Sequence, residues 1–88
     1  LFSNFPNPFN SSTKINYQLL EKDYVRLNIF DNNGNALIEL VNKFQRAGVY
    51  SMLWRGTNKQ GLTLPSGIYY YQIQVGDHLK SNKMVLIK

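Results

Sequence analysis

The clearest pattern of hydrophobic and polar positions lies at residues 67–75, which read GIYYYQIQV. Side chains of a β-strand alternate between its two faces, so Tyr69, Tyr71 and Ile73 share one face and Tyr70 lies on the other. The first face is apolar throughout and the second is mixed. This pattern predicts an antiparallel strand with one face on a core and the other partly in water.

Similar segments predict five further strands. Turn residues separate them at spacings of about 8–12 residues, as in all-β domains. The predicted strands cover residues 13–19, 24–31, 36–41, 49–55 and 79–88. Such a run of short strands predicts an all-β protein, an antiparallel β-sandwich of six to seven strands.

Three segments are less regular. The apolar residues of 36–41 do not alternate cleanly, so we expect a bulge or a twisted edge there, with a short amphipathic helix as the alternative. Residues 42–48 are expected to form a polar loop. Residues 1–12 are rich in proline and asparagine and are expected to form an extended lead-in. Its phenylalanines would pin it against the core of a sandwich domain at residues 13–88.

The inward-facing residues of the predicted strands are large enough to fill the space between two sheets. They are Ile15, Tyr17, Val25, Leu27, Ile29, Tyr50, Met52, Trp54, Tyr69, Tyr71, Ile73, Met84 and Leu86.

The composition fits one small folded domain. The chain has 88 residues, which is enough for one core but not for two. It has no cysteine, which excludes a disulfide framework and a thiolate metal site. No apolar run approaches the length that spans a bilayer. Because the chain begins at Leu1 and not at methionine, we expect a piece of a longer protein whose missing part lies on the N-terminal side.

The net charge of +5 is unevenly distributed. Residues 1–42 carry a net charge of −1, whereas residues 43–88 carry +6. A basic half can attract nucleic acid, anionic lipid or an acidic protein. A solubilising surface is the favoured interpretation. The basic residues do not interleave with exposed aromatic residues in any one element, so we expect no nucleic-acid binding.

No group of residues predicts catalysis. A catalytic site needs a nucleophile with a base, a carboxylate pair or a metal cluster. His78, the only histidine, falls in a predicted turn, and so do Glu21 and Asp23. The loop at residues 31–34 faintly resembles a calcium loop, but it lacks the later bidentate glutamate. We therefore expect no catalytic residue, no cofactor, no metal ion and no enzymatic activity.

The run of three tyrosines at residues 69–71 admits two interpretations. It could form a stacking platform for sugars or bases, or it could pack into the core. Alternation places Tyr69 and Tyr71 inside and leaves only Tyr70 outside, which favours core packing.

Five segments, in order along nearly the whole chain, resemble a known family. They are FPNPFN at residues 5–10, IFD with a later glycine and two leucines at 29–40, GVY and WRG at 48–56, PSGIYYY at 65–71 and KMVLIK at 83–88. Together they resemble the type A C-terminal sorting domains of the type IX secretion system. The stretch from 54 to 71 also resembles the Ig-like domain of flagellar hook-capping proteins. The resemblance implies an Ig-like sandwich.

Two positions depart from the sorting-domain pattern. Arg55 stands where the family usually has aspartate, which reverses the charge at that turn, and Ser11 stands where it usually has proline. Neither position touches the terminal segment at residues 83–88.

The resemblance implies a secretion signal at the C-terminus of a cargo protein. The cargo would be an N-terminal domain outside this chain, which reaches the periplasm of a Gram-negative bacterium by a separate leader. An outer-membrane translocon would then recognise the folded sorting domain, which we expect to be a monomer. A cell-surface, sortase-like peptidase would remove it, leaving the cargo secreted or held at the cell surface.

The last predicted strand is the candidate recognition element. A terminal strand can offer its backbone to a partner by β-augmentation. Two lysines flank its apolar run and could attract an acidic acceptor. We expect the recognised face to comprise this strand and the neighbouring tyrosine-rich corner: Lys83, Met84, Val85, Leu86, Ile87, Lys88, Gly67 and Tyr69. The alternative is that the strand only completes the sandwich.

Two other functions remain open. The domain could be a non-catalytic Ig-like accessory module of a secreted hydrolase, acting as a spacer or as a carbohydrate binder. An exposed row of aromatic residues on one sheet face would favour the second of these roles. It could also be a structural module that assembles extracellular filaments, which would form oligomers as its concentration rises.

Overall fold

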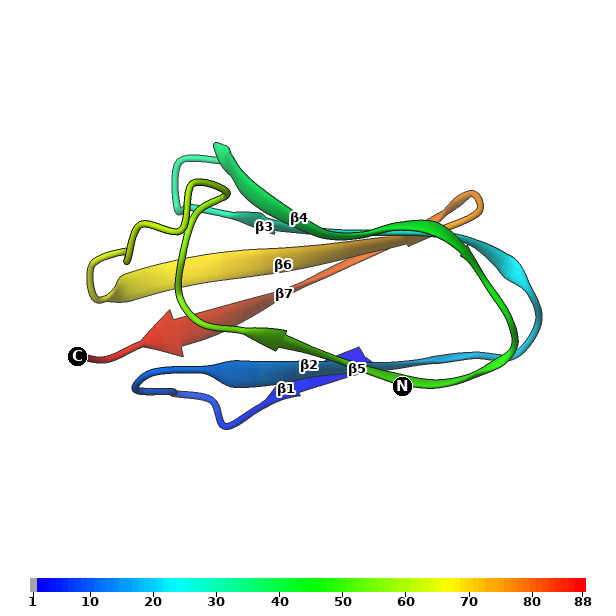
Figure 1. Cartoon of the computed structure of the whole chain (residues 1–88), viewed down its shortest axis with the longest axis horizontal. Helices are drawn as coiled ribbons and strands as arrows, with labels where there is room; N and C mark the ends of the chain where they lie inside the picture. Colours follow the sequence, from blue (N-terminus) through cyan, green and yellow to red (C-terminus); the bar gives the residue numbers. More distant parts are fainter. Residues whose placement is uncertain (1) are drawn as a thin grey trace.

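The computed structural model describes residues 2–88 and folds them into a two-layered β-sandwich (Figure 1). One sheet has the strand order β1-β2-β5 and the other the order β4-β3-β6-β7. Every strand pair within the sheets is antiparallel. The strands are β1 (Phe2–Phe5), β2 (Thr13–Leu19), β3 (Asp23–Phe30), β4 (Ala36–Gln45), β5 (Gly48–Trp54), β6 (Gly67–Val75) and β7 (His78–Leu86).

This architecture confirms the predicted all-β antiparallel sandwich. No helix occurs between residues 2 and 88, so none there could cross a membrane. In β2, β3 and β6, alternate side chains face the opposite sheet and are buried. Burying one large apolar side chain contributes roughly 1.5–3 kcal/mol. A one-residue slip would turn the whole buried set outward, so burial fixes the register of these strands.

The core lies between the two sheets. Its buried apolar side chains are Phe9, Ile15, Tyr17, Leu19, Val25, Leu27, Ile29, Val41, Trp54, Tyr69, Tyr71, Ile73, Met84 and Leu86. Tyr50 and Met52, which were predicted to face inward, are partly buried and pack against this set. Trp54 joins the layers, since its ring centroid lies 5.7 Å from that of Phe9 and 5.6 Å from that of Tyr69.

Strand β4 is longer than the sequence predicts. It runs to Gln45, so the prediction that residues 42–45 belong to a polar loop was wrong. Tyr24 and Phe44 are partners across β3 and β4, and their rings meet edge to face with centroids 4.8 Å apart. This cross-strand aromatic pair supports the ladder beyond the apolar run. The register between β3 and β4 also shifts, which confirms the predicted bulge.

The N-terminal segment takes part in both sheets. Phe2–Phe5 forms β1, an edge strand beside β2. The chain then crosses to the other sheet, where Phe9 forms a parallel bridge with Leu86 of β7. Phe9 is buried, whereas Phe5 is 76% exposed. Of these two phenylalanines, it is therefore Phe9 that pins the segment to the core.

Candidate functional site

The fold brings the two parts of the predicted recognition face together. Strands β6 and β7 are paired so that Gly67 lies opposite Leu86 and Tyr69 lies opposite Met84. The tyrosine-rich corner and the end of β7 therefore lie next to each other at one corner of the four-stranded sheet, in which β7 is the edge strand (Figure 1).

The face contains both accessible and buried side chains. Met84 and Leu86 are 0% and 1% exposed, so they serve the core and are closed to a partner in the folded state. Lys83, Ile87 and Lys88 are exposed. Val85 is half-buried and points away from the core, as alternation requires.

One hydrogen bond fixes the tyrosine-rich corner, and another fixes Trp54, whose ring packs against Tyr69. The Tyr69 hydroxyl donates to the Pro65 carbonyl oxygen at 2.7 Å, and the Trp54 indole N–H donates to the Thr57 carbonyl oxygen at 2.9 Å. Burial, with a smaller contribution from the charge of Asp31, raises the pKa of Tyr69. The hydroxyl therefore stays protonated at neutral pH and remains a donor that holds the turn before β6.

The outer backbone edge of β7 is occupied at its end. The Phe9 N–H donates to the Val85 carbonyl oxygen, and the Ile87 N–H donates to the Phe9 carbonyl oxygen, each at 2.9 Å. The Asn7 side chain continues the pattern: its Oδ1 accepts from the Val85 N–H at 3.0 Å and its Nδ2 donates to the Lys83 carbonyl oxygen at 3.3 Å. We call the segment that makes these bonds, residues 7–9, the latch.

The latch limits how a partner can add a strand to β7. Backbone β-augmentation at Val85 and Ile87 would require the latch to leave, because its groups already occupy those donors and acceptors. With the latch in place, a partner meets the side chains of Lys83, Val85, Ile87 and Lys88. The Lys88 N–H also donates to the Ser66 hydroxyl at 2.9 Å, which ties the end of the strand to the turn before β6.

Sequence reasoning missed Asn7 and Ser66. Asn7 lies 78 residues from Val85, and no periodic pattern links the two. The signal was the prolines on either side of Asn7, which keep the segment out of a regular ladder and leave the asparagine side chain to supply the hydrogen bonds.

The electrostatics of the site are set by its lysines. Within residues 2–88 the only ion pair joins Arg26 to Glu39, at 2.9 Å, on the outer face of the sheet. Lys83 and Lys88 therefore carry no acidic partner in this range. Two unpaired cations on either side of Val85 and Ile87 form an accessible basic and apolar surface.

The groups considered for catalysis or metal binding do not converge. Over the described residues, no cluster of three or more histidine, cysteine, aspartate or glutamate side chains is placed to hold a metal ion. His78 is exposed at the start of β7. The Asp31 carboxylate is engaged by its own turn, where Oδ1 accepts from the N–H groups of Asn33 and Asn35 at 2.8 and 2.9 Å.

The hydrogen bonds of this turn lower the pKa of Asp31. Those from the backbone and side chain of Asn35 are the main reason that the pKa of Asp31 lies below its usual value. The carboxylate therefore serves the hairpin between β3 and β4.

The sandwich and its latched edge define the class of protein, an Ig-like β-sandwich module. The model of the FlgD Ig-like domain family matches residues 7–78, and the chain belongs to that family. No curated protein matches the sequence significantly. The predicted Ig-like fold and the resemblance to hook-capping proteins are confirmed.

Solved structures share this fold at low sequence identity. Dimeric latent PorU from Porphyromonas gingivalis is similar over 98% of this chain, with a TM-score of 0.76 and 19% identity. PorZ of P. gingivalis, described as an essential bacterial surface component of the type-IX secretion system, is similar over 99%, with a TM-score of 0.70 and 16% identity. FlgD from P. aeruginosa is similar over 84%, with a TM-score of 0.65 and 24% identity.

The chain spans only part of each of these proteins. It covers 9% of the PorU chain, 11% of the PorZ chain and 57% of the FlgD chain. These likenesses support the resemblance to sorting domains at the level of the domain type. An Ig-like domain family also suggests a non-catalytic module.

Proposed function

We propose that this domain is a C-terminal sorting signal, which directs an attached cargo protein across the outer membrane by the type IX secretion system. The observation that carries the proposal is the accessible C-terminal end of the sheet, where Lys83 and Val85 project from β7, which is fixed on both sides, and Ile87 and Lys88 follow directly after it. The similarity to PorZ, a surface component of that system, supports it.

The mechanism is recognition of a folded surface. One translocon must accept many different cargoes, so the shared element has to present the same side chains in the same positions. Pairing with β6 on one edge and with the latch on the other holds the exposed side chains in place before the partner arrives. Preorganisation of this kind lowers the entropic cost of binding. The two lysines would steer the domain toward an acidic acceptor.

In this proposal the cargo lies N-terminal to the domain and enters the periplasm by its own leader. A sortase-like peptidase at the cell surface then removes the domain, and the cargo is secreted or retained at the surface of a Gram-negative bacterium.

The test fuses the domain to a reporter that carries a periplasmic leader, in a bacterium with a type IX system. Deleting residues 84–88 should leave the reporter in the periplasm. Since this deletion also removes Met84 and Leu86 from the core, surface variants must separate recognition from folding. The double variant Lys83→Ala/Lys88→Ala and the single variant Ile87→Ala should remain folded and should export less reporter.

Lys59→Ala provides the matched control, because Lys59 is an exposed lysine in the loop before β6. It should export as the parent does. Export that survives both the deletion and the surface variants would refute the proposal.

A further inference from the structure

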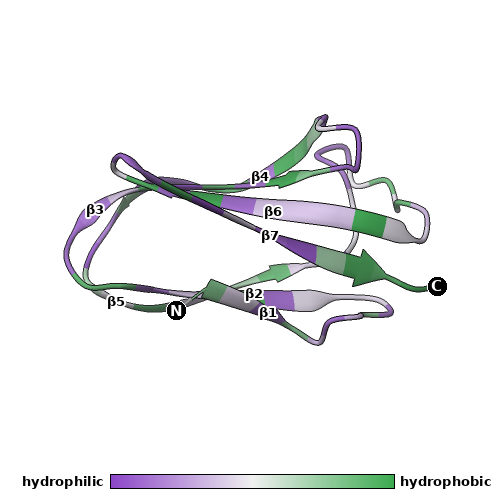
Figure 2. Cartoon of the chain, turned by 180° about the vertical axis from the view of Figure 1, so that it is seen from behind, coloured by the Kyte–Doolittle hydropathy of each residue, from purple (hydrophilic) through white to green (hydrophobic). Residues whose placement is uncertain are grey.

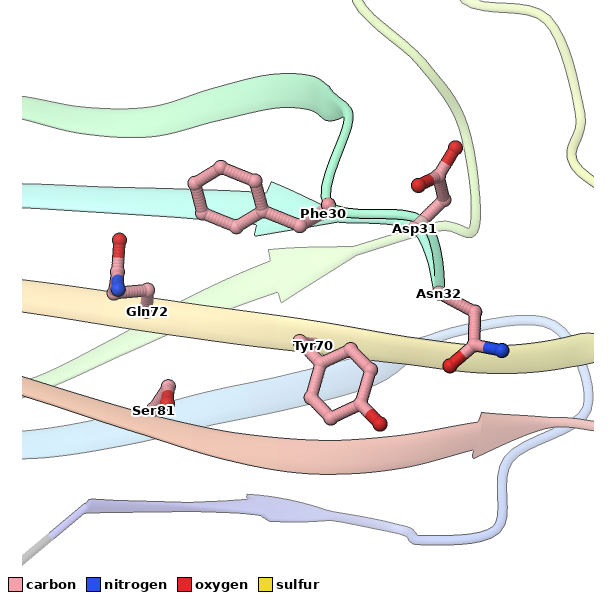
Figure 3. Close-up of a pocket in the computed structure, with 7 residues that line it drawn as sticks. Phe30, Asp31, Asn32, Tyr70, Gln72 and Ser81 are labelled. Carbon is pink, nitrogen blue, oxygen red and sulfur yellow. The ribbon is translucent and has the colours of Figure 1, made fainter.

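The outer face of the four-stranded sheet is hollowed near the end of β3 and the part of β6 that pairs with it (Figure 3). This hollow has a volume of about 380 Å³ and includes Phe30, Tyr70 and Gln72 in its lining. A second hollow of about 250 Å³ adjoins it and shares Phe30 and Gln72. The two form one shallow trough, whose larger part falls at the low end of the range for small-molecule sites.

The trough is bordered by two aromatic rings that the core does not use. Phe30 and Tyr70 are partners across β3 and β6, one residue beyond the buried pair Ile29 and Tyr71. Alternation therefore turns both rings outward. Figure 3 shows the Phe30 ring beside β3 and the Tyr70 ring on the side of β6 toward β7, separate from each other on the same face of the sheet, and both are half-buried. Tyr70 is also the tyrosine that the sequence pattern leaves outside the core.

The polar groups of the trough are mostly uncharged. Between the rings and the far end of the sheet lie the side chains of Asn28, Gln72, Gln74 and Ser81. The two charged groups of the lining are already engaged. The Arg26 guanidinium donates to Glu39 at 2.9 and 3.0 Å, and the Asp31 carboxylate accepts the hydrogen bonds of its own turn.

The lining of the trough includes the amide side chains of Asn28, Gln72 and Gln74. An amide supplies both donors and an acceptor. The trough therefore combines flat apolar rings with neutral groups that can both donate and accept hydrogen bonds. From Phe30 to Arg26 along β3 it extends for about 14 Å, at about 3.4 Å per residue.

We propose that this trough binds a neutral saccharide. The C–H face of one pyranose ring would pack on Phe30 and that of a second ring on Tyr70, where the negative face of each aromatic ring attracts the weakly positive C–H groups. Gln72, Asn28 and Ser81 would exchange hydrogen bonds with the hydroxyl groups. The length of the trough suits an oligosaccharide better than a single sugar.

The charges argue against nucleic acid as the ligand. A phosphate backbone requires several cations along its path. The lining of the trough contributes Arg26, which is paired with Glu39. Lys83 lies opposite Tyr70 at the rim, where it contributes one positive charge. The saccharide site does not depend on the sorting function, because its core residues lie on β3 and β6 and not at the end of β7.

The test titrates the whole domain with cellohexaose, xylohexaose, laminarihexaose, mannohexaose and chitohexaose by isothermal titration calorimetry. Oligothymidylate serves as the nucleic-acid probe. At least one neutral hexasaccharide should bind with a Kd of about 1 mM or below. Tyr70→Ala should weaken that binding by about tenfold or more, because removing a stacked aromatic side chain generally has an effect of this size.

The matched control is Phe44→Ala. Phe44 is 64% exposed and lies on the same sheet, outside the trough. This variant should bind within about twofold of the parent. Gln72→Ala should reduce affinity without changing the folded spectrum measured by circular dichroism, because Gln72 faces outward.

Three results would overturn the proposal. The first is no binding of any neutral hexasaccharide by the folded parent domain. The second is equal binding by the Tyr70→Ala and Phe44→Ala variants. The third is oligothymidylate binding that depends on Tyr70 in place of saccharide binding.

Discussion

The two halves of β7 pair with the same strand but lie in different surroundings. Along residues 78–82 every side chain is exposed, although each residue has a partner in β6. Along residues 83–86, Met84 and Leu86 are almost fully buried and the outer backbone edge is held by the latch. Figure 2 shows the same contrast, with a hydrophilic stretch before a hydrophobic arrowhead.

The difference comes from what lies opposite each half. Leu86 faces a packed region that includes Gly56 and Phe9. The first half of β7 instead borders an open hollow of about 550 Å³ between the sheets, lined in part by Leu20, His78 and Lys80. Pairing with a neighbouring strand is therefore not enough to bury a strand. Burial requires a second layer, and Phe9 of the latch together with Gly56 helps to supply it over the second half.

The largest effect that follows from this contrast is on stability. Leu86→Ala should lower the free energy of unfolding by about 3 kcal/mol, because it leaves a cavity in the packed half. Leu79→Ala makes the same change on the same strand, but Leu79 is 58% exposed. Leu79→Ala should therefore lower the free energy of unfolding by no more than about 0.5 kcal/mol. Urea unfolding of both variants measures the difference, and equal losses would remove the distinction between the halves.

A smaller effect is expected from the latch itself. Asn7→Ala removes the side-chain bonds to Val85 and Lys83, so it should lower the free energy of unfolding by about 1 kcal/mol. It should also speed amide hydrogen exchange at Val85 more than at Ile87, whose N–H donates to the Phe9 carbonyl oxygen.

Asn10→Ala is the control for the latch, since it alters an exposed asparagine just beyond these residues. Its exchange rates should match those of the parent. Unchanged exchange at Val85 in Asn7→Ala would mean that the asparagine does not hold this edge.

The smallest effect concerns alkaline pH at the boundary between the halves, where Tyr71 pairs with Asn82. Burial raises the pKa of Tyr71 above its ordinary value of 10.0, against a lowering contribution from the Asn82 hydrogen bond. The neutral hydroxyl therefore contributes stability that is complete below pH 10 and is lost as pH rises through the folded-state pKa.

Urea unfolding at neutral pH and at about pH 11 measures this loss. The decrease should be smaller in Tyr71→Phe, which cannot ionise. An equal decrease in the parent and in Tyr71→Phe would show that Tyr71 does not contribute.

The packed half of β7 could be predicted from sequence, and the latch could not. Met84 and Leu86 alternate with Lys83 and Val85, so their inward direction follows from the period of a strand. The bond between Asn7 and Val85 depends on a side chain meeting a backbone edge 78 residues away, which no local pattern encodes. The composition of the lead-in indicates that phenylalanines pin it, but not which ones.

The missed end of β4 has a similar cause. Residues 42–45 have no apolar alternation, and their place in the sheet depends on the contact of Phe44 with Tyr24 on another strand. Only one of the two aromatic residues of the proposed saccharide trough could be predicted to face outward as part of such a site. Alternation placed Tyr70 outside, but its neighbour Phe30 becomes a partner only through the register of β3 and β6.

The parallel bridge between Phe9 and Leu86 has a mechanical consequence. If residue 2 and residue 88 are pulled apart, the segments on either side of this bridge slide past each other along the strand direction. The bonds from the Phe9 N–H to Val85 and from the Ile87 N–H to Phe9 then bear the load together. Under this shear geometry the two hydrogen bonds cannot break one after the other. The domain should therefore resist tension applied between residues 2 and 88 along the polypeptide.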